Sequence, residues 1–315
     1  MSSLGLDIGG ANLKFFYDAD KRGGVEYFPM WKKAKKLEEK LCEFAKTFSP
    51  DKVGVVITAE LSDVFASKAE GVKFVEKAVR KAFGNSTIYF LDVEGRLSKK
   101  AEPPLAFAAS NWIASTLFLA RNFESFILAD MGSTTTDLIP FKGKILAAKT
   151  DYERLRRGEL IYIGVLRTPV FHVLPFFTAP LVPEFFAITG DVFVVTGDIK
   201  PEDYLCETPD GRGRSVEECM QRLARQLCCD LHEVGAEFVR GLAKETKKYI
   251  LERISSAMFE ISAKYGIKTV IGCGIGEFLL EGVAKKLDLD YVSIKKKYGD
   301  CSVYFPAYAM ARLLE

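Results

Sequence analysis

Apolar and polar residues follow two different periods along the first part of the chain. In a Lys/Glu-rich segment, apolar residues stand at 37, 41, 44, 45 and 48, a three-to-four spacing that predicts an amphipathic helix. Short apolar runs rich in β-branched residues and bounded by turn residues predict strands. Up to residue 119 the predicted strands are 3–8, 13–19, 25–30, 53–58 and 88–91, and the predicted helices are 31–48, 65–83 and 104–119.

The same order of elements recurs in the second half of the chain. Three strands are again joined by tight turns, and helices and strands follow them. The predicted strands are 126–130, 134–141, 144–148, 269–272 and 291–294, and the predicted helices are 215–230, 236–264, 277–286 and 304–314. The pattern therefore predicts an α/β protein with an internal structural duplication and an insertion at about 152–217.

The composition narrows the class of protein. The chain has 315 residues, enough for about two domains, and 44 Lys+Arg against 42 Asp+Glu give a formal net charge of +2. This balance argues against a nucleic-acid-binding protein, whose affinity would depend on a large positive field. Seven Cys without a CxxC pair and only two His argue against a zinc site, a disulfide framework and a multi-histidine metal site.

The apolar segments predict a soluble, cytoplasmic protein without a membrane partner. Residues 1–10 lack the basic and apolar regions of a signal peptide. The longest uncharged stretch, 168–183, is interrupted by prolines and is too short to cross a bilayer as a helix. The oligomeric state stays open, homo-oligomers included.

The first motif with candidate chemistry is the turn after the first predicted strand, LDIGGANLK at residues 6–14. Glycines allow the backbone to approach a ligand closely, and successive N–H groups hold phosphate oxygens well. Asp7 suits Mg²⁺ held through water, and Lys14 suits a phosphate. The candidate phosphate-binding residues of the turn are Gly9, Gly10 and Asn12. The alternative is a plain glycine hairpin with a surface lysine.

The second motif, ADMGSTTTD at residues 129–137, has the same strand-end carboxylate and glycine turn. Asp130 and Asp137 suit a hydrated cation, and hydroxyls and turn amides suit phosphate oxygens. The candidate phosphate-binding residues are Gly132, Ser133, Thr134 and Thr135, and the alternative is a threonine-rich hairpin. Because the two turns occupy equivalent places in the two repeats, we expect a phosphate site with a divalent metal, and Asp7 and Asp130 are its candidate ligands.

A third motif, VIGCGIGEFL at residues 270–279, runs from a strand through a glycine-rich turn into a helix. Gly272, Gly274 and Gly276 would suit a phosphate or nucleotide at the start of that helix. The spacing matches a dinucleotide fingerprint only loosely and lacks its βαβ context. Its significance comes from its place at the fourth strand of the second repeat.

The insertion adds two signals. Arginine binds phosphate and carboxylate well, which makes Arg154 and Arg167 candidate binding residues. A solvated basic turn is the alternative for Arg154, while Arg167 lies in an apolar strand and is expected to be paired. Phenylalanines are also frequent there and would suit aromatic substrate rings or an irregular buried cover; they are Phe171, Phe176, Phe177, Phe185, Phe186 and Phe193.

Together the three motifs resemble the two phosphate motifs and the adenosine motif of the actin, sugar-kinase and Hsp70 superfamily, over the whole chain. Residues 130–140 and 154–169 further resemble the hydantoinase/oxoprolinase group. Its short, single-subunit branch, linked to methanofuran and tetrahydromethanopterin C1 metabolism, is resembled at 5–14, 130–140, 158–169, 190–198 and 204–230. The resemblance implies two RNase H-like domains with a central cleft, at 1–122 plus 303–315 and at 123–302, the second carrying the insertion.

The resemblance to the methanofuran-forming members implies a transferase acting on small molecules. It would join an aminomethylfuran-methyl diphosphate to the phenol oxygen of γ-glutamyltyramine and release diphosphate. Mg²⁺ and Lys14 would neutralise the leaving group, and a carboxylate among Asp7, Asp130 and Asp137 would take the phenol proton.

Other functions fit the same motifs. An ATP-dependent kinase or a hydantoinase/oxoprolinase-type hydrolase of this fold is the alternative enzyme, and a non-catalytic nucleotide-gated protein is a third reading. The carboxylates and the lysine favour an enzyme. The departure of 272–276 from a strong nucleotide site counts against ATP as the ligand, although ATP stays open.

Overall fold

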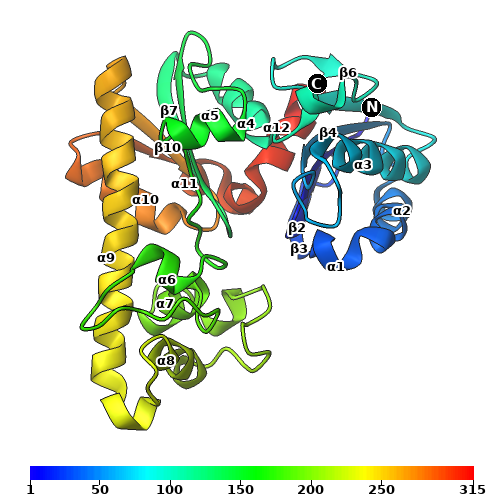
Figure 1. The fold of residues 1–315 in the computed structure, drawn as a ribbon. Helices are drawn as coiled ribbons and strands as arrows, with labels where there is room; N and C mark the ends of the chain where they lie inside the picture. The colour runs from blue at the N-terminus through cyan, green and yellow to red at the C-terminus, as the bar shows by residue number, and fades with distance from the viewer. The chain divides into compact units, whose positions relative to one another are not determined.

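The computed structural model describes residues 1–315, which form two units (Figure 1). Unit 1 comprises Met1–Leu128, Ile139–Arg157 and Ser293–Glu315. Unit 2 comprises Ala129–Leu138 and Gly158–Val292. The predicted domain boundaries remain a proposal.

A six-stranded sheet forms the centre of unit 1. Its strands lie in the order β3 (Arg22–Tyr27), β2 (Asn12–Tyr17), β1 (Ser3–Gly9), β4 (Lys52–Thr58), β5 (Thr87–Leu91) and β6 (Leu97–Ser98). β1 pairs antiparallel with β2 and parallel with β4. Both β1 and β4 are continuous buried runs, as expected for strands covered on both faces.

Unit 1 also contains seven helices. They are α1 (Met30–Lys33), α2 (Leu37–Phe48), α3 (Lys68–Ala82), α4 (Asn111–Ala120), α5 (Asp151–Arg156), α11 (Ile294–Tyr298) and α12 (Phe305–Leu313). Figure 1 shows α2 beside α3, and α12 packs against β1, β4 and α4. Glycine makes this approach of α12 feasible, because a Cβ on Gly54 would lie 2.6 Å from the side chain of Met310. Side chains alternate along a strand, so Asp7 shares the α12 face with Gly5.

The second sheet has five strands in the order β11 (Asp290–Ser293), β10 (Thr269–Cys273), β7 (Ser125–Met131), β8 (Thr136–Lys142) and β9 (Leu160–Ile161). The helices of unit 2 are α6 (Val170–Val173), α7 (Thr189–Val195), α8 (Val216–Arg225), α9 (Leu231–Tyr265) and α10 (Glu277–Lys286). In Figure 1, α7 and α8 pack along the long helix α9, which has a kink at Gly235.

Two sheets with interspersed helices confirm the predicted α/β class. Three expectations about individual elements are wrong. The predicted strand 144–148 contributes only a bridge between Phe141 and Ile145, because a turn at Gly143 with φ +65° reverses the chain first. Its place beside β8 is taken by β9.

The other two wrong expectations are continuous helices at 31–48 and 104–119. The first is divided by a 3-10 helix at Ala34–Lys36. The second consists of a 3-10 helix at Pro104–Phe107 and the separate helix α4. Between them Ala109 has φ +51°, which no α-helix accommodates. No helix of the chain combines the length and apolarity that crossing a membrane requires.

Candidate active site

The first predicted turn lies at the carboxyl end of β1, where the chain enters β2. Asp7 and Lys14 are direct cross-strand partners, so their side chains share one face of the sheet. Lys14 Nζ lies 3.4 Å from Asp7 Oδ2, and Thr58 Oγ1 of β4 donates to Asp7 Oδ1 at 3.2 Å. Because Asp7 is 3% exposed and Lys14 is 19% exposed, a buried carboxylate lies beneath an ammonium that reaches the surface.

The glycines of this turn are closely surrounded by neighbouring atoms. A Cβ on Gly9 would lie 2.8 Å from the carbonyl oxygen of Asn12. A Cβ on Gly10 would meet Ser62 Oγ at 3.2 Å, so the segment after β4 passes directly beside the turn. Glycine positions, which have no side chain, let main-chain groups approach a phosphate closely.

The second predicted turn joins β7 to β8 and belongs to unit 2. Within it, Gly132 N donates to Thr135 O at 2.9 Å. The segment after β9 packs against it, because the backbone N–H of Arg167 donates to Ser133 O at 3.0 Å. Arg167 Nη1 also donates to Thr134 Oγ1 at 3.1 Å. The structure thus brings one predicted arginine onto the hydroxyl-rich turn.

The third predicted motif packs against the same turn. Gly276 N donates to the carbonyl oxygen of Met131, the residue after Asp130, at 2.9 Å. Gly274 has φ +91°, and a Cβ there would lie 2.6 Å from Asp130 Oδ1. Gly272 has a different role, since its missing side chain makes room for the ring of Tyr291. Unit 2 therefore gathers the second and third motifs around the Asp130 carboxylate.

Two predicted residues have other surroundings. Asp137 lies in β8 opposite Leu160 of β9 and is buried. Arg154 lies in α5 of unit 1, where Nη2 donates to Asp151 at 2.6 Å and the guanidinium stands 4.8 Å from the ring centroid of Trp112. Arg154 is 3% exposed. Of the two predicted arginines, Arg167 is the one placed on a predicted turn.

The phenylalanines of the insertion do not share one environment. Phe176 and Phe185 are more than half exposed, whereas Phe193 is fully buried and packs edge-on against Phe278 of α10. Because these phenylalanines differ so much in burial, they do not line one common aromatic pocket.

The chain has no cluster of three or more His, Cys, Asp or Glu side chains arranged to hold a metal ion. The candidate ligands Asp7 and Asp130 lie on separate turns, one in each unit. Mg²⁺ commonly keeps several waters and takes one or two protein carboxylates together with substrate phosphates. Both turns fit that kind of binding, because each has a carboxylate beside glycines; at Gly274 the backbone approaches Asp130 so closely that a Cβ would lie 2.6 Å from Oδ1.

A further carboxyl, Glu60, was missed by the sequence reasoning. It follows β4 by two residues and is 2% exposed. Burial, together with the nearby charge of Asp151, raises the pKa of Glu60 to about 7, although Lys68 opposes this. The signal was available in the run Ile57-Thr58-Ala59-Glu60, where a carboxylate comes just after a buried strand, much as Asp7 lies near the end of β1.

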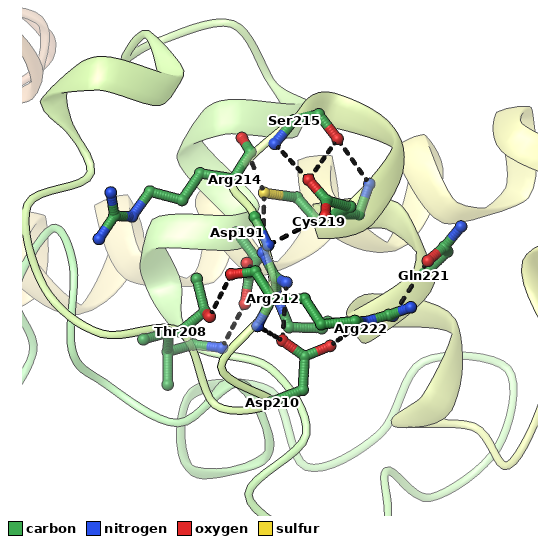
Figure 2. Close-up of polar contacts among 12 residues, drawn as sticks. Asp191, Thr208, Asp210, Arg212, Arg214, Ser215, Cys219, Gln221 and Arg222 are labelled. Carbon is green, nitrogen blue, oxygen red and sulfur yellow. Dashed lines mark hydrogen bonds and ion pairs between the residues drawn. The ribbon is translucent and has the colours of Figure 1, made fainter.

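Figure 2 shows a polar centre within unit 2 that was also missed. Arg222 Nε donates to Asp191 Oδ1 at 2.8 Å, and its Nη1 donates to Asp210 Oδ1 at 3.0 Å. Asp191 also accepts from the backbone N–H of Ile188 at the start of α7. Burial raises the pKa of Asp191 even though Arg222 opposes the shift. The centre joins α7 to α8 and has the character of a structural link.

An open hollow of about 680 Å³ lies beside this centre, lined by Pro201, Glu202 and residues 211–215. Two of its backbone donors are already occupied by a carboxylate of the chain itself. Gly213 N donates to Glu218 Oε1 at 2.9 Å, and Ser215 N donates to Glu218 Oε2 at 3.0 Å. The start of α8 is therefore capped from within.

Comparison with known proteins identifies the type of fold and the family of this chain. The fold is that of the actin-like ATPases and sugar kinases. A ROK-family glucokinase from Streptomyces griseus, solved with glucose and AMPPNP, matches 99% of this chain and 100% of its own, with a TM-score of 0.51 and 13% identity. At that identity the likeness concerns the fold alone. The chain belongs to the hydantoinase/oxoprolinase family, whose profile matches residues 51–315.

Two relatives are more similar in sequence. One, from Methanocaldococcus jannaschii, is 39% identical over 325 aligned residues, which cover 99% of this chain and 97% of the relative. The other, from Methanococcus vannielii, is 36% identical over 214 residues, 63% of this chain and 95% of the relative. Both are named (4-{4-[2-(gamma-L-glutamylamino)ethyl]phenoxymethyl}furan-2-yl)methanamine synthase. These matches confirm the family that the motifs indicate.

Proposed function

We propose that this chain makes the compound for which its relatives are named, as a step of methanofuran biosynthesis. It would join an aminomethylfuran-methyl diphosphate to the phenol oxygen of γ-glutamyltyramine and release diphosphate. The observation that carries this proposal is the 39% sequence identity to the Methanocaldococcus jannaschii relative, over 99% of the chain. In the named compound an ether oxygen joins a phenyl ring to a furfuryl carbon, so the enzyme is a transferase that forms this bond.

Departure of diphosphate requires that its developing negative charge be neutralised. In unit 1, Lys14 above Asp7 supplies a cation at a glycine turn. In unit 2, Arg167 on the Thr134 hydroxyl supplies a second cation at the other turn. A furan ring stabilises positive charge on its attached CH₂ group, so breaking the carbon–oxygen bond depends mainly on these charges. We assign phosphate binding to both turns.

Asp7 and Asp130 are the proposed Mg²⁺ ligands, each on its own turn. When bound together with the diphosphate, Mg²⁺ would neutralise part of the leaving group's charge. The residues of the chain then have separate tasks. Lys14 and Arg167 bind phosphate oxygens, and the glycines permit close approach of the main chain.

The direct test is mass spectrometry of the product formed by the purified chain from the furan diphosphate and γ-glutamyltyramine in the presence of Mg²⁺. We expect the ether product and one diphosphate per turnover. A thermal-shift comparison addresses the alternative, because ligands that bind the native state raise the melting temperature. Stabilisation by Mg²⁺ with diphosphate supports the proposal, whereas stabilisation by Mg²⁺ with ATP alone supports a kinase or hydrolase.

A further inference from the structure

Buried polar atoms without a hydrogen-bond partner gather in one part of unit 1. They include Glu60 Oε2, Ser110 Oγ and Trp112 Nε1. The segments that carry them are neighbours, since Ile57 and Ala108 form a parallel bridge and Ser110 N donates to Ile57 O at 3.3 Å. Most buried polar groups in proteins are paired. Several unpaired ones in adjoining segments therefore point to a ligand that completes them.

The Glu60 carboxyl is the titratable member of this set, and charges of both signs face it. The backbone N–H of Ala109 donates to it, Asp151 of α5 opposes its ionisation, and Lys68 at the start of α3 favours it. Asp151 is itself paired with Lys68 at 3.9 Å and with Arg154 at 2.6 Å. Since the pKa of Glu60 is about 7, the carboxyl is divided between its two forms at neutral pH. That is the condition in which a general base works best.

Glu60 lies at the same sheet edge as the first glycine turn. β1 and β4 are parallel neighbours with Gly9 opposite Thr58, so Glu60 follows the strand end next to Asp7. The Asp7 oxygens are in contact with Lys14 and Thr58, whereas Glu60 keeps one oxygen without a hydrogen-bond partner. The edge thus combines a carboxylate engaged with a cation and a carboxyl oxygen available to a proton donor.

The loop 61–67 that follows Glu60 suits an aromatic ligand. It passes beside Gly10, as the position of Ser62 shows. Leu61 is 57% exposed and Val64 is 46% exposed, and apolar surface of this kind packs against a ring face. None of residues 61–67 is buried. Phe65 anchors the loop by packing against Phe74 and the core of unit 1. Residues 61–64 have fewer buried contacts, and such segments open at low free energy, so this part of the loop can move aside to admit a ligand to the buried oxygen.

We propose that Glu60 accepts the proton of the phenol nucleophile, whose ring packs on the loop 61–67. This assignment rests on the proposed function. The phenolic proton passes to Glu60 Oε2 while the phenol oxygen bonds to the furfuryl carbon. The bond between that carbon and the diphosphate oxygen breaks, and diphosphate leaves with the electron pair. Glu60 thereby takes the role for which Asp7, Asp130 and Asp137 were the sequence candidates.

The test compares wild type with Glu60→Gln on two nucleophiles, γ-glutamyltyramine and its ring-difluorinated analogue, whose phenol is more acidic. At pH 7 we expect the variant to lose about 10²–10⁴-fold in kcat with γ-glutamyltyramine. With the analogue the loss shrinks by about tenfold or more, because a more acidic phenol depends less on a base. The wild-type kcat/KM rises with pH up to about 7, and the variant lacks that rise.

Glu39→Gln, at an exposed position of α2, is the matched control and is expected to behave as wild type. Equal losses with both nucleophiles, or an unchanged pH profile in Glu60→Gln, would overturn the assignment while leaving the proposed function standing. Absence of ether product from wild type would overturn both. If circular dichroism shows Glu60→Gln unfolded, Glu60→Asp takes its place. It should keep the pH-dependent rise, and loss of that rise in the folded Asp variant would count against Glu60.

Discussion

Arg222 and Asp191 form an ion pair in which neither side chain has exposed surface, with Nε donating to Oδ1 at 2.8 Å (Figure 2). Asp191 belongs to α7 and Arg222 to α8, so the pair joins two helices of unit 2. Removing one partner of such a pair leaves a buried charge without compensation. The stability of this part of the chain therefore depends on both side chains together.

Replacing Arg222 by methionine is expected to lower the unfolding free energy by about 3–5 kcal/mol, because Asp191 stays buried without its cation. Urea denaturation followed by circular dichroism measures this. Lys248→Met, at an exposed pair with Glu245, is the control and should leave the unfolding midpoint unchanged. If the unfolding free energy of Arg222→Met fell no further than that of the control, the ion pair between Arg222 and Asp191 would be dispensable for stability.

Lys14→Met should reduce kcat/KM for the furan diphosphate by about 10²–10³-fold, because it removes a cation proposed to act on the leaving group. The melting temperature of the free protein should also fall, because the buried Asp7 loses the cation paired with it. Steady-state kinetics and thermal shift with diphosphate check both points. Lys77→Met on the exposed side of α3 is the control. Unaltered kinetics in Lys14→Met would exclude this lysine from phosphate binding.

Asp130→Asn should abolish turnover while the protein stays folded. The change keeps the shape of the side chain but removes the negative charge that we assign to the metal. Product formation and melting temperature are the two measurements. Asp290→Asn, at an exposed residue of β11, should retain activity. Normal turnover in Asp130→Asn would remove this carboxylate from the mechanism.

Gly274→Ala should destabilise unit 2 by about 1–3 kcal/mol, because a residue with a Cβ is strained at φ +91°. The added Cβ would also press on Asp130 Oδ1, which lies 2.6 Å from its position, so turnover should fall as well. Gly282→Ala is the opposite case. This exposed helical glycine has open space around it, and alanine should stabilise the chain by about 0.5–1 kcal/mol. Equal unfolding free energies for the two variants would contradict the strain at Gly274.

The pH dependence of stability should report on Glu60. Its pKa is about 7 in the folded chain against 4.5 for the ordinary group, so between these values the folded state binds more protons than the unfolded state. Stability therefore falls as pH rises from about 4.5 to about 7, by roughly 3 kcal/mol from this group. Urea denaturation at pH 5 and pH 8 should show that Glu60→Gln lacks this part of the decline. An identical decline in both proteins would mean that Glu60 titrates normally.

The pattern of apolar residues predicted most strands well, because buried strands need continuous apolar runs. The strands β1, β4 and β7 coincide with predicted apolar runs, and α10 has the predicted bounds of 277–286. The exception is the third strand of the second half. β9 is only two residues long and exists through its pairing with β8, a long-range relation that no local pattern records.

The candidate turns were predictable for a related reason, since glycines and strand-end carboxylates are local features. The hydrogen bond between Arg167 and Thr134 joins residues that are 33 positions apart. It could not be predicted from the sequence, because it forms only when the segment after β9 packs against the turn between β7 and β8. Glu60 and Arg222 were missed because their properties come from burial. Glu60 has a raised pKa only because β4, α3 and the segment before α4 enclose it.

The sequence by itself determined the α/β class, the repeated order of elements, the glycine turns and the family, because each depends on residue types at short spacing. The tertiary structure alone decided which glycines face a carboxylate, which arginine reaches a turn and which carboxyl titrates near neutrality. These depend on distances and on exclusion of water, and both arise only when segments far apart in the chain pack together.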